Sequence, residues 1–134
     1  MGHMSEPSQH PERAQFLEID HVQLAMPAAG EALAERFYRD ILGFTRVPKP
    51  DHLERRGGCW FRFANVHVHL GVDEQFAPAR KAHPAFLVSG LDTLRRRLEA
   101  SGVGIVRDTD LAGYRRFYTS DPFGNRLEFM ERIR

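Results

Sequence analysis

The sequence predicts an α+β protein made of two similar halves, and three observations support this fold class. Several short segments alternate apolar and polar residues, which is typical of strands with one buried face. Two longer segments repeat apolar residues at every third or fourth position, as amphipathic helices do. The order strand, helix, strand, strand, strand then occurs twice along the chain. We therefore predict a single domain over residues 16–134, with βαβββ modules at 16–72 and 83–134 joined by a linker at 73–82.

The first module begins with a strand and a helix. A strand is expected over 16–26, with Val22, Leu24 and Met26 on one face and Ile19, His21 and Gln23 on the other. Pro27 ends this strand, and a helix is expected over 28–42, followed by Gly43 as a helix-terminating residue. The expected apolar stripe of the helix consists of Leu33, Ala34, Phe37, Tyr38, Ile41 and Leu42.

Three further strands complete the first module. A short strand is expected at 44–47, and the charged, glycine-rich residues 51–58 are expected to form a loop. Strands at 59–63 and 66–72 follow, with a tight turn between them. The second of these has the clearest alternation in the chain: Val66, Val68, Leu70 and Val72 form one face, and His67, His69 and Gly71 form the other.

The second module repeats this order. A strand is expected at 83–89, and a helix at 91–100 with Leu91, Leu94 and Leu98 on its buried side. A short strand around 104–106 precedes a hairpin over 116–130, whose turn, Asp-Pro-Phe-Gly-Asn, occupies 121–125. In its last strand Leu127 and Phe129 form the core face, while Arg126, Glu128 and Met130 lie on the opposite face.

Four potential metal ligands occupy matching places in the two modules. His21 and His83 are in the first strand of each module, and His69 and Glu128 are in the last. All four lie opposite the apolar face, so they would converge if the strands shared one curved sheet. Imidazole and carboxylate groups bind Zn, Ni, Fe(II), Co and Mn. A single strand histidine is more often a surface or core residue than a ligand, but matched placement favours a metal site. His67 shares the face of His69, and spacing alone does not choose between them.

Composition indicates a small protein without a polyelectrolyte or membrane partner. The formal charge of +1 predicts no nucleic-acid binding, and no apolar run is long enough for a membrane span or a signal-peptide core. The one cysteine, Cys59, excludes an internal disulfide, fits a reducing cytoplasm and has no activating neighbour in sequence. Residues 1–15 are expected to be a disordered leader or cloning remnant, so His3 and His10 are left out of any site.

Four segments carry a family resemblance: residues 19–24 (Ile-Asp-His-Val-Gln-Leu), 37–44 (Phe-Tyr-Arg-Asp-Ile-Leu-Gly-Phe), 83–86 (His-Pro-Ala-Phe) and 121–128 (Asp-Pro-Phe-Gly-Asn-Arg-Leu-Glu). The pattern resembles the vicinal oxygen chelate superfamily over about residues 17–133. That superfamily includes glyoxalase I, fosfomycin-resistance thiol transferases, extradiol dioxygenases and bleomycin-resistance proteins. The resemblance implies that the modules form a curved mixed β-sheet cup around a divalent metal, with the helices on the convex side.

The resemblance also assigns roles to residues. It implies His21, His83 and Glu128 as metal ligands, with His69 at the family's fourth position, where glyoxalase I commonly has glutamate. Tyr118 corresponds to a tyrosine that contacts substrate in the fosfomycin enzymes. Arg115 and Arg116 flank this position, and one of the two is a candidate contact for an anionic substrate. The chain lacks a clear equivalent of the oxyanion- and potassium-binding segments of those enzymes, which argues against fosfomycin as the substrate.

The leading hypothesis for function is a metal-dependent, glyoxalase-like isomerase or lyase. It would act on a small oxygen-chelating substrate by Lewis-acid stabilisation of an enolate or alkoxide, with Glu128 as a candidate base. One alternative is a small Fe(II) dioxygenase, although the familiar extradiol enzymes usually carry two pairs of modules. The other is a bleomycin-resistance-like dimer that only sequesters a ligand; such proteins commonly lack the metal triad. The resemblance also implies a homodimer, in which module one of one chain pairs with module two of its partner.

Overall fold

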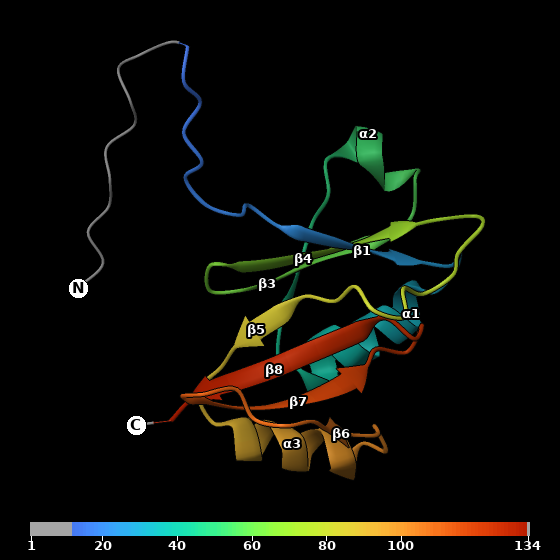
Figure 1. The fold of residues 1–134 in the computed structure, drawn as a ribbon. Helices are drawn as coiled ribbons and strands as arrows, with labels where there is room; N and C mark the ends of the chain where they lie inside the picture. Colours follow the sequence, from blue (N-terminus) through green and yellow to red (C-terminus); the bar gives the residue numbers. More distant parts are fainter. Residues whose placement is uncertain (1–11, 134) are drawn as a thin grey trace.

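The computed structural model describes residues 12–133 and contains two four-stranded mixed sheets, one from each half of the chain (Figure 1). Sheet A has the order β1–β4–β3–β2, and sheet B has the order β5–β8–β7–β6. The strands of sheet A are β1 Val22–Met26, β2 Thr45–Val47, β3 Cys59–Phe63 and β4 Val66–Val72. The strands of sheet B are β5 Ala85–Leu87, β6 Val106–Arg107, β7 Tyr114–Ser120 and β8 Arg126–Arg132. The expected leader at 1–15 falls mostly outside the described residues and stays a prediction.

The repeated order of elements is confirmed by the strand pairing. In each module the first strand pairs in parallel with the last strand, β1 with β4 and β5 with β8, and the remaining pairs are antiparallel. A parallel pair requires a crossover connection, which the helix and the intervening strands supply. The chain therefore has the predicted fold class of two βαβββ modules.

The helices differ from expectation in two places. They are α1 Glu31–Ala34, which continues as the π-helix η1 Glu35–Ile41, α2 Asp51–Glu54 and α3 Leu91–Ala100. The segment expected to be a loop at 51–58 contains the single turn α2, which follows Pro50. The apolar stripe of the first helix is centred on Ala34, Phe37 and Tyr38, so Leu33, predicted to be buried, is 48% exposed. Neighbouring helical residues point about 100° apart, which places Leu33 on the flank of that stripe.

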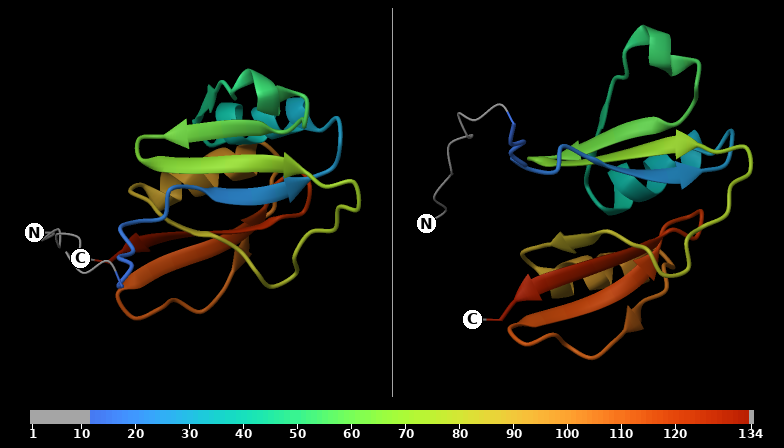
Figure 2. Two further views of the ribbon diagram at one scale, coloured as in Figure 1. Left: turned by 90° about the horizontal axis from the view of Figure 1, so that it is seen from above. Right: turned by 45° about the horizontal axis from the view of Figure 1, so that its top comes forward.

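The helices η1 and α3 each cover the apolar face of the sheet of their own module, whereas α2 has no buried residue. Val68 and Leu70 of β4 pack with Phe37 in the core, and Leu127 of β8 packs with Leu91 and Leu98 of α3, as predicted. Figure 2 shows η1 on the face of sheet A that is turned toward sheet B, and Figure 1 shows α3 on the side of sheet B away from sheet A. Because strands alternate their faces, the side of sheet A that carries His69 is turned away from module two.

Buried hydrogen bonds join the two modules at the hairpin turn between β7 and β8. The hydroxyl of Tyr38 on η1 donates to Asp121 Oδ2 at 2.6 Å, and Asn125 Nδ2 donates to the carbonyl of Ala25 at 2.8 Å. Asp121 also accepts hydrogen bonds from the backbone N–H groups of Phe123 and Asn125. Burial and the nearby Asp121 carboxylate raise the pKa of Tyr38, so its hydroxyl stays protonated and serves as a donor.

Cys59 is fully buried in β3, and burial raises the pKa of its thiol to about 11. We therefore expect the native protein to react very slowly with a thiol reagent such as Ellman's reagent at pH 8. The same thiol should react fully once the chain is unfolded in guanidinium chloride, which provides the control. Rapid stoichiometric labelling of the native protein would contradict this assignment of Cys59 as a core residue.

None of the helices in the described part of the chain is long and apolar enough to cross a membrane.

Candidate functional site

The second module brings His83 and Glu128 together. On β8, Leu127 and Phe129 face the core, so Glu128 projects from the opposite face of the strand. The strand expected at 83–89 is shorter in the structure, so His83 lies just before β5, in which Ala85 is the register partner of Glu128. His83 Nε2 lies 2.9 Å from Glu128 Oε1, and Glu128 is only 5% exposed. Glu128 is therefore a buried, paired carboxylate and not a solvated surface residue.

The main chain fixes the orientation of the His83 ring. His83 Nδ1 lies 2.8 Å from the carbonyl oxygen of Lys81, which is the usual way in which a metal-binding histidine is held by its second nitrogen. Nε2 of His83 and Oε1 of Glu128 then point at each other. These are the two atoms that the pair would offer to a metal, and their donor chemistry suits a borderline divalent ion.

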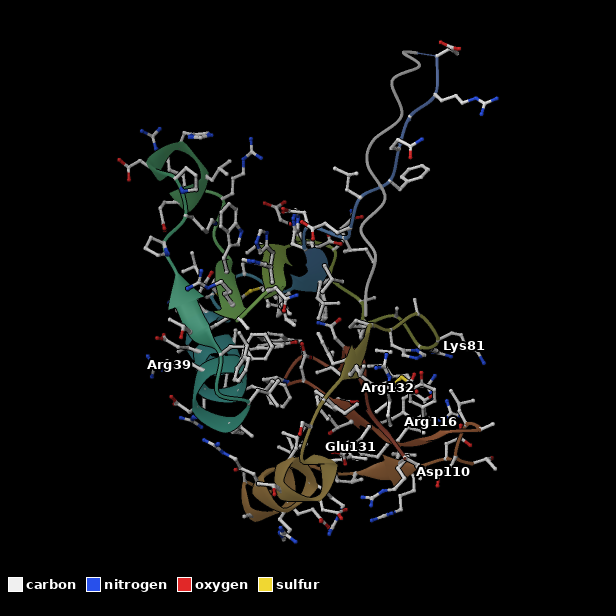
Figure 3. The ribbon with its side chains drawn as sticks, turned by 90° about the vertical axis from the view of Figure 1, so that its left-hand side faces the viewer. Arg39, Lys81, Asp110, Arg116, Glu131 and Arg132 are labelled. Carbon is white, nitrogen blue, oxygen red and sulfur yellow. The ribbon has the colours of Figure 1, made fainter. Side chains whose placement is uncertain are left out.

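Tyr118 and Arg116 of β7 surround this pair. Tyr118 is the register partner of Glu128 and lies edge-on to His83, with ring centroids 5.2 Å apart. Arg116 Nη1 donates to the Tyr118 hydroxyl at 2.8 Å and lies 3.3 Å from Glu128 Oε2. Arg116 also donates from Nε to the carbonyl of Thr109 at 2.9 Å. In Figure 3, Arg116 and Lys81 lie on the same side of the molecule. Tyr118 and Arg116 therefore hold the Glu128 carboxylate in place from the neighbouring strand, β7.

The first module brings together a different set of rings. His69 of β4 is stacked between His21 and Trp60, with ring centroids 4.0 Å from His21 and 4.1 Å from Trp60. Burial, followed by the neighbouring His21, lowers the pKa of His69 to about 4. His69 is therefore neutral at neutral pH, which is the form of imidazole that binds metals. These three rings line a cavity of about 430 Å³, which His67 also lines. The ring stacked on His21 is that of His69.

The four candidate ligands form two separate pairs in one chain. Among residues 12–133, no group of three or more His, Cys, Asp or Glu side chains is close enough to hold a metal ion. The reason is the arrangement of the sheets: β1 and β5 are each an edge strand of its own sheet, and η1 faces module two in place of the His21–His69 pair. The convergence expected for a single shared sheet does not occur within the chain. The residues fit a metal by chemistry, but each pair alone supplies only two ligands.

The two arginines before Tyr118 are placed on opposite faces of β7. Arg116 reaches Glu128, as described above, whereas Arg115 forms an ion pair with Asp92 of α3 at 2.7 Å. The structure therefore does not bring Arg115 to the Glu128 pair. Strand alternation predicts this result, because Arg116 and Tyr118 are two residues apart and Arg115 is not in phase with them.

Sequence reasoning missed Arg126 as a site residue. Its guanidinium carbon lies 4.0 Å from the centroid of the Tyr118 ring, on the opposite strand of the hairpin. The signal was available in the alternation of β8, which places Arg126 on the same face as Glu128.

Comparison with known proteins identifies the fold and the family. The family described as glyoxalase/bleomycin resistance protein/dioxygenase superfamily matches residues 18–129. A protein from Bacillus anthracis assigned to the glyoxalase family is 45% identical, with a TM-score of 0.87 over 90% of this chain and 99% of that chain. No curated protein matches the chain.

Two more distant structures share the fold alone. A glyoxalase/dioxygenase from Nostoc punctiforme is 17% identical, with a TM-score of 0.73 over 97% of this chain and 99% of that chain. A lactoylglutathione lyase from Agrobacterium tumefaciens is 23% identical, with a TM-score of 0.62 over 81% of this chain and 90% of that chain. The fold, the repeated pairs of residues and the family match agree: this chain belongs to the glyoxalase/bleomycin resistance protein/dioxygenase superfamily.

Proposed function

We propose that the protein is a metal-dependent enzyme of the glyoxalase-like isomerase or lyase type. Its substrate would be a small molecule with two neighbouring oxygen atoms that can chelate a divalent ion. The observation that carries this proposal is the partly buried His83–Glu128 pair, whose ligand atoms lie 2.9 Å apart and whose histidine is oriented by a backbone carbonyl. A paired ionisable group as buried as Glu128 is costly to maintain, which favours a functional role over a structural one.

We further propose that a second copy of the chain completes the site. His21 and His69 of one chain would join His83 and Glu128 of its partner, which gives four ligands from two pairs. The arrangement of the modules supports this pairing, because the His21–His69 face of sheet A is turned away from the module two of its own chain. The unpaired edges of β1 and β5 also favour association across a two-fold axis.

The residues around Glu128 suit proton transfer next to a carbonyl group. The bound metal would supply Lewis-acid stabilisation of the developing enolate or alkoxide. Glu128 would accept the substrate proton at Oε2, the oxygen that faces Arg116 at 3.3 Å. Arg116 donates to the Tyr118 hydroxyl oxygen, so the Tyr118 proton is free to be donated to a substrate oxygen. Burial of Glu128 keeps water away from the carboxylate during this transfer.

Metal analysis tests this proposal. Protein purified without chelator or affinity tag and loaded separately with Zn, Ni, Co, Mn or Fe(II) should bind about one ion per chain of at least one metal. Glu128→Gln should lose most of this metal, whereas Glu99→Gln, on the exposed side of α3, should retain it. Elemental mass spectrometry after gel filtration provides the measurement. Full metal occupancy in the His21→Ala/Glu128→Ala double variant would refute the ligand assignment.

One observation favours a second candidate function, a dimer that sequesters a ligand without chemistry. The stacked rings of His21, His69 and Trp60 form a flat aromatic wall beside the 430 Å³ cavity of module one, and such a wall suits a planar ligand. The two functions differ in their dependence on Glu128. Binding of a planar ligand that survives Glu128→Gln, together with the absence of a bound metal in wild-type protein, would favour sequestration.

A further inference from the structure

A second cavity adjoins Tyr118, and Arg116 is not among its lining residues. It has a volume of about 540 Å³ and lies between the linker at Pro78, the segment before β6 at Gly104, and the hairpin of β7 and β8. Two arginines, Arg80 and Arg126, line it, and no carboxylate does. Asp108, which is not among the lining residues, interacts electrostatically with Arg126, but two cationic groups against one carboxylate still give the cavity a positive potential that attracts anions.

Arg126 has the geometry of a ligand-binding arginine. Its guanidinium stacks on the Tyr118 ring at 4.0 Å, which fixes the plane of the group and leaves its edge free. Within residues 12–133 the half-buried Arg126 guanidinium makes no hydrogen bond and no ion pair within 4 Å, and its interaction with Asp108 is electrostatic at longer range. A guanidinium carries five N–H donors, so this fork is available to a bound molecule.

The contrast with Arg116 shows which arginine is free. Arg116 donates to the Thr109 carbonyl and the Tyr118 hydroxyl, and it lies within 4 Å of Glu128 and of Asp108, at 3.3 and 3.6 Å. Its donors are thus committed to the protein. The sequence favoured Arg115 or Arg116 as the contact for an anionic substrate, but Arg115 is paired with Asp92 and Arg116 supports Glu128. Arg126 is left as the arginine beside Tyr118 with unused donors.

We propose that Arg126, assisted by Arg80, binds the anionic group of the substrate, and that the substrate is a small oxyacid. Its carboxylate or phosphoryl group would lie against the Arg126 fork, and its chelating oxygens would reach past Tyr118 toward Glu128. Tyr118 contacts both ends of this path, because its ring stacks on Arg126 and its hydroxyl shares Arg116 with Glu128. The identification of the bound anion as a substrate group rests on the proposed function; the anion site itself does not.

Anion titration of the metal-free protein tests the subsite apart from the metal. Chelator-treated protein is titrated with inorganic phosphate and, separately, with acetate at constant ionic strength, and the Arg Nε–Hε signals are followed by NMR. We expect saturable shifts of the Arg126 signal in wild-type protein. Tighter binding of phosphate would indicate a phosphoryl group in the substrate, and tighter binding of acetate would indicate a carboxylate.

Three variants separate the Arg126 fork from general positive charge. Arg126→Met keeps much of the packing on Tyr118. It should lower the affinity for the preferred anion by at least about tenfold, which corresponds to the loss of one charge-assisted hydrogen bond. Arg126→Lys should recover part of the affinity, since it restores the charge but not the planar fork. Arg132→Met is the matched control: Arg132 is an exposed arginine on the same strand outside the cavity, and its loss should change the affinity by less than about twofold.

Equal anion affinity in Arg126→Met and wild type, or equal losses in Arg126→Met and Arg132→Met, would overturn the subsite. Absence of saturable shifts in the wild type would do the same. Because the titration contains no metal, a protein that binds phosphate at Arg126 but never binds a divalent ion would refute the proposed function and leave the anion site standing. A protein that binds the divalent ion but not the anion would refute the anion site and leave the proposed function standing.

Discussion

Replacement of Leu127 by asparagine is expected to lower the free energy of unfolding by about 2–5 kcal/mol. Leu127 is fully buried in β8, an interior strand of sheet B, and belongs to the same core cluster as Leu91 and Leu98 of α3. The asparagine amide would enter this apolar layer without a hydrogen-bond partner, and the packing of the leucine methyl groups would be lost at the same time.

Urea unfolding followed by circular dichroism provides the measurement. Leu127→Met, which nearly conserves volume, should cost less than about 1.5 kcal/mol, and Leu111→Asn, at a position 45% exposed, should cost little. If Leu127→Asn unfolded together with the wild type, the assignment of the two faces of β8 would be wrong. The placement of Glu128 opposite the core would then lose its basis as well.

The second large effect concerns metal binding in mixed dimers. His21→Ala and Glu128→Ala are each expected to bind little metal alone. If sites are shared between chains, a heterodimer of the two variants contains one intact site and one doubly damaged site. Mixing should therefore restore about one ion per heterodimer, from nearly none. Sites built within single chains would remain damaged, and mixing would restore nothing.

A reciprocal mixture sharpens this experiment. The double variant His21→Ala/Glu128→Ala, mixed with wild type, gives heterodimers in which every shared site has lost one ligand. Shared sites then predict little metal in the heterodimer, whereas sites within one chain predict one intact site. Differently tagged subunits allow the heterodimers to be isolated before metal analysis. Recovery in the reciprocal mixture but not in the first would contradict the shared-site proposal.

Local patterns were sufficient to predict most of the elements. The bounds of β3, β4 and α3 agree with the sequence, because strict alternation and a clear leucine stripe mark each of them. The α2 turn was missed because the charge and glycine content at 51–58 indicated a loop; in the structure Pro50 is the N-cap residue of α2. Leu33 was wrongly predicted to be buried. The six apolar residues of the helix form a stripe that is wider than the surface the helix buries.

The sequence likewise predicted some features of the candidate site and not others. Alternation predicted that Glu128 lies on the face of its strand opposite Leu127 and Phe129, and the structure places it there, 2.9 Å from His83. The separation of that pair from His21 and His69 could not be read from the sequence, since alternation assigns a face to each residue but does not orient one sheet against the other. Hydrogen bonds such as that of Tyr38 to Asp121 set the relative orientation of the sheets, and they join residues far apart in the chain.

The hydrogen bonds that join module one to the hairpin turn between β7 and β8 have a consequence for how a dimer would assemble. Asp121 accepts hydrogen bonds from Tyr38 and Asn125, and Asn125 also binds Ala25, so separating the two modules would strand buried polar groups. The subunit would therefore keep its modules together and dock as a rigid body through the surfaces that carry the two pairs. Exchange between dimers would then proceed at the rate of dissociation under native conditions, without an unfolding step or a hinge at residues 73–82.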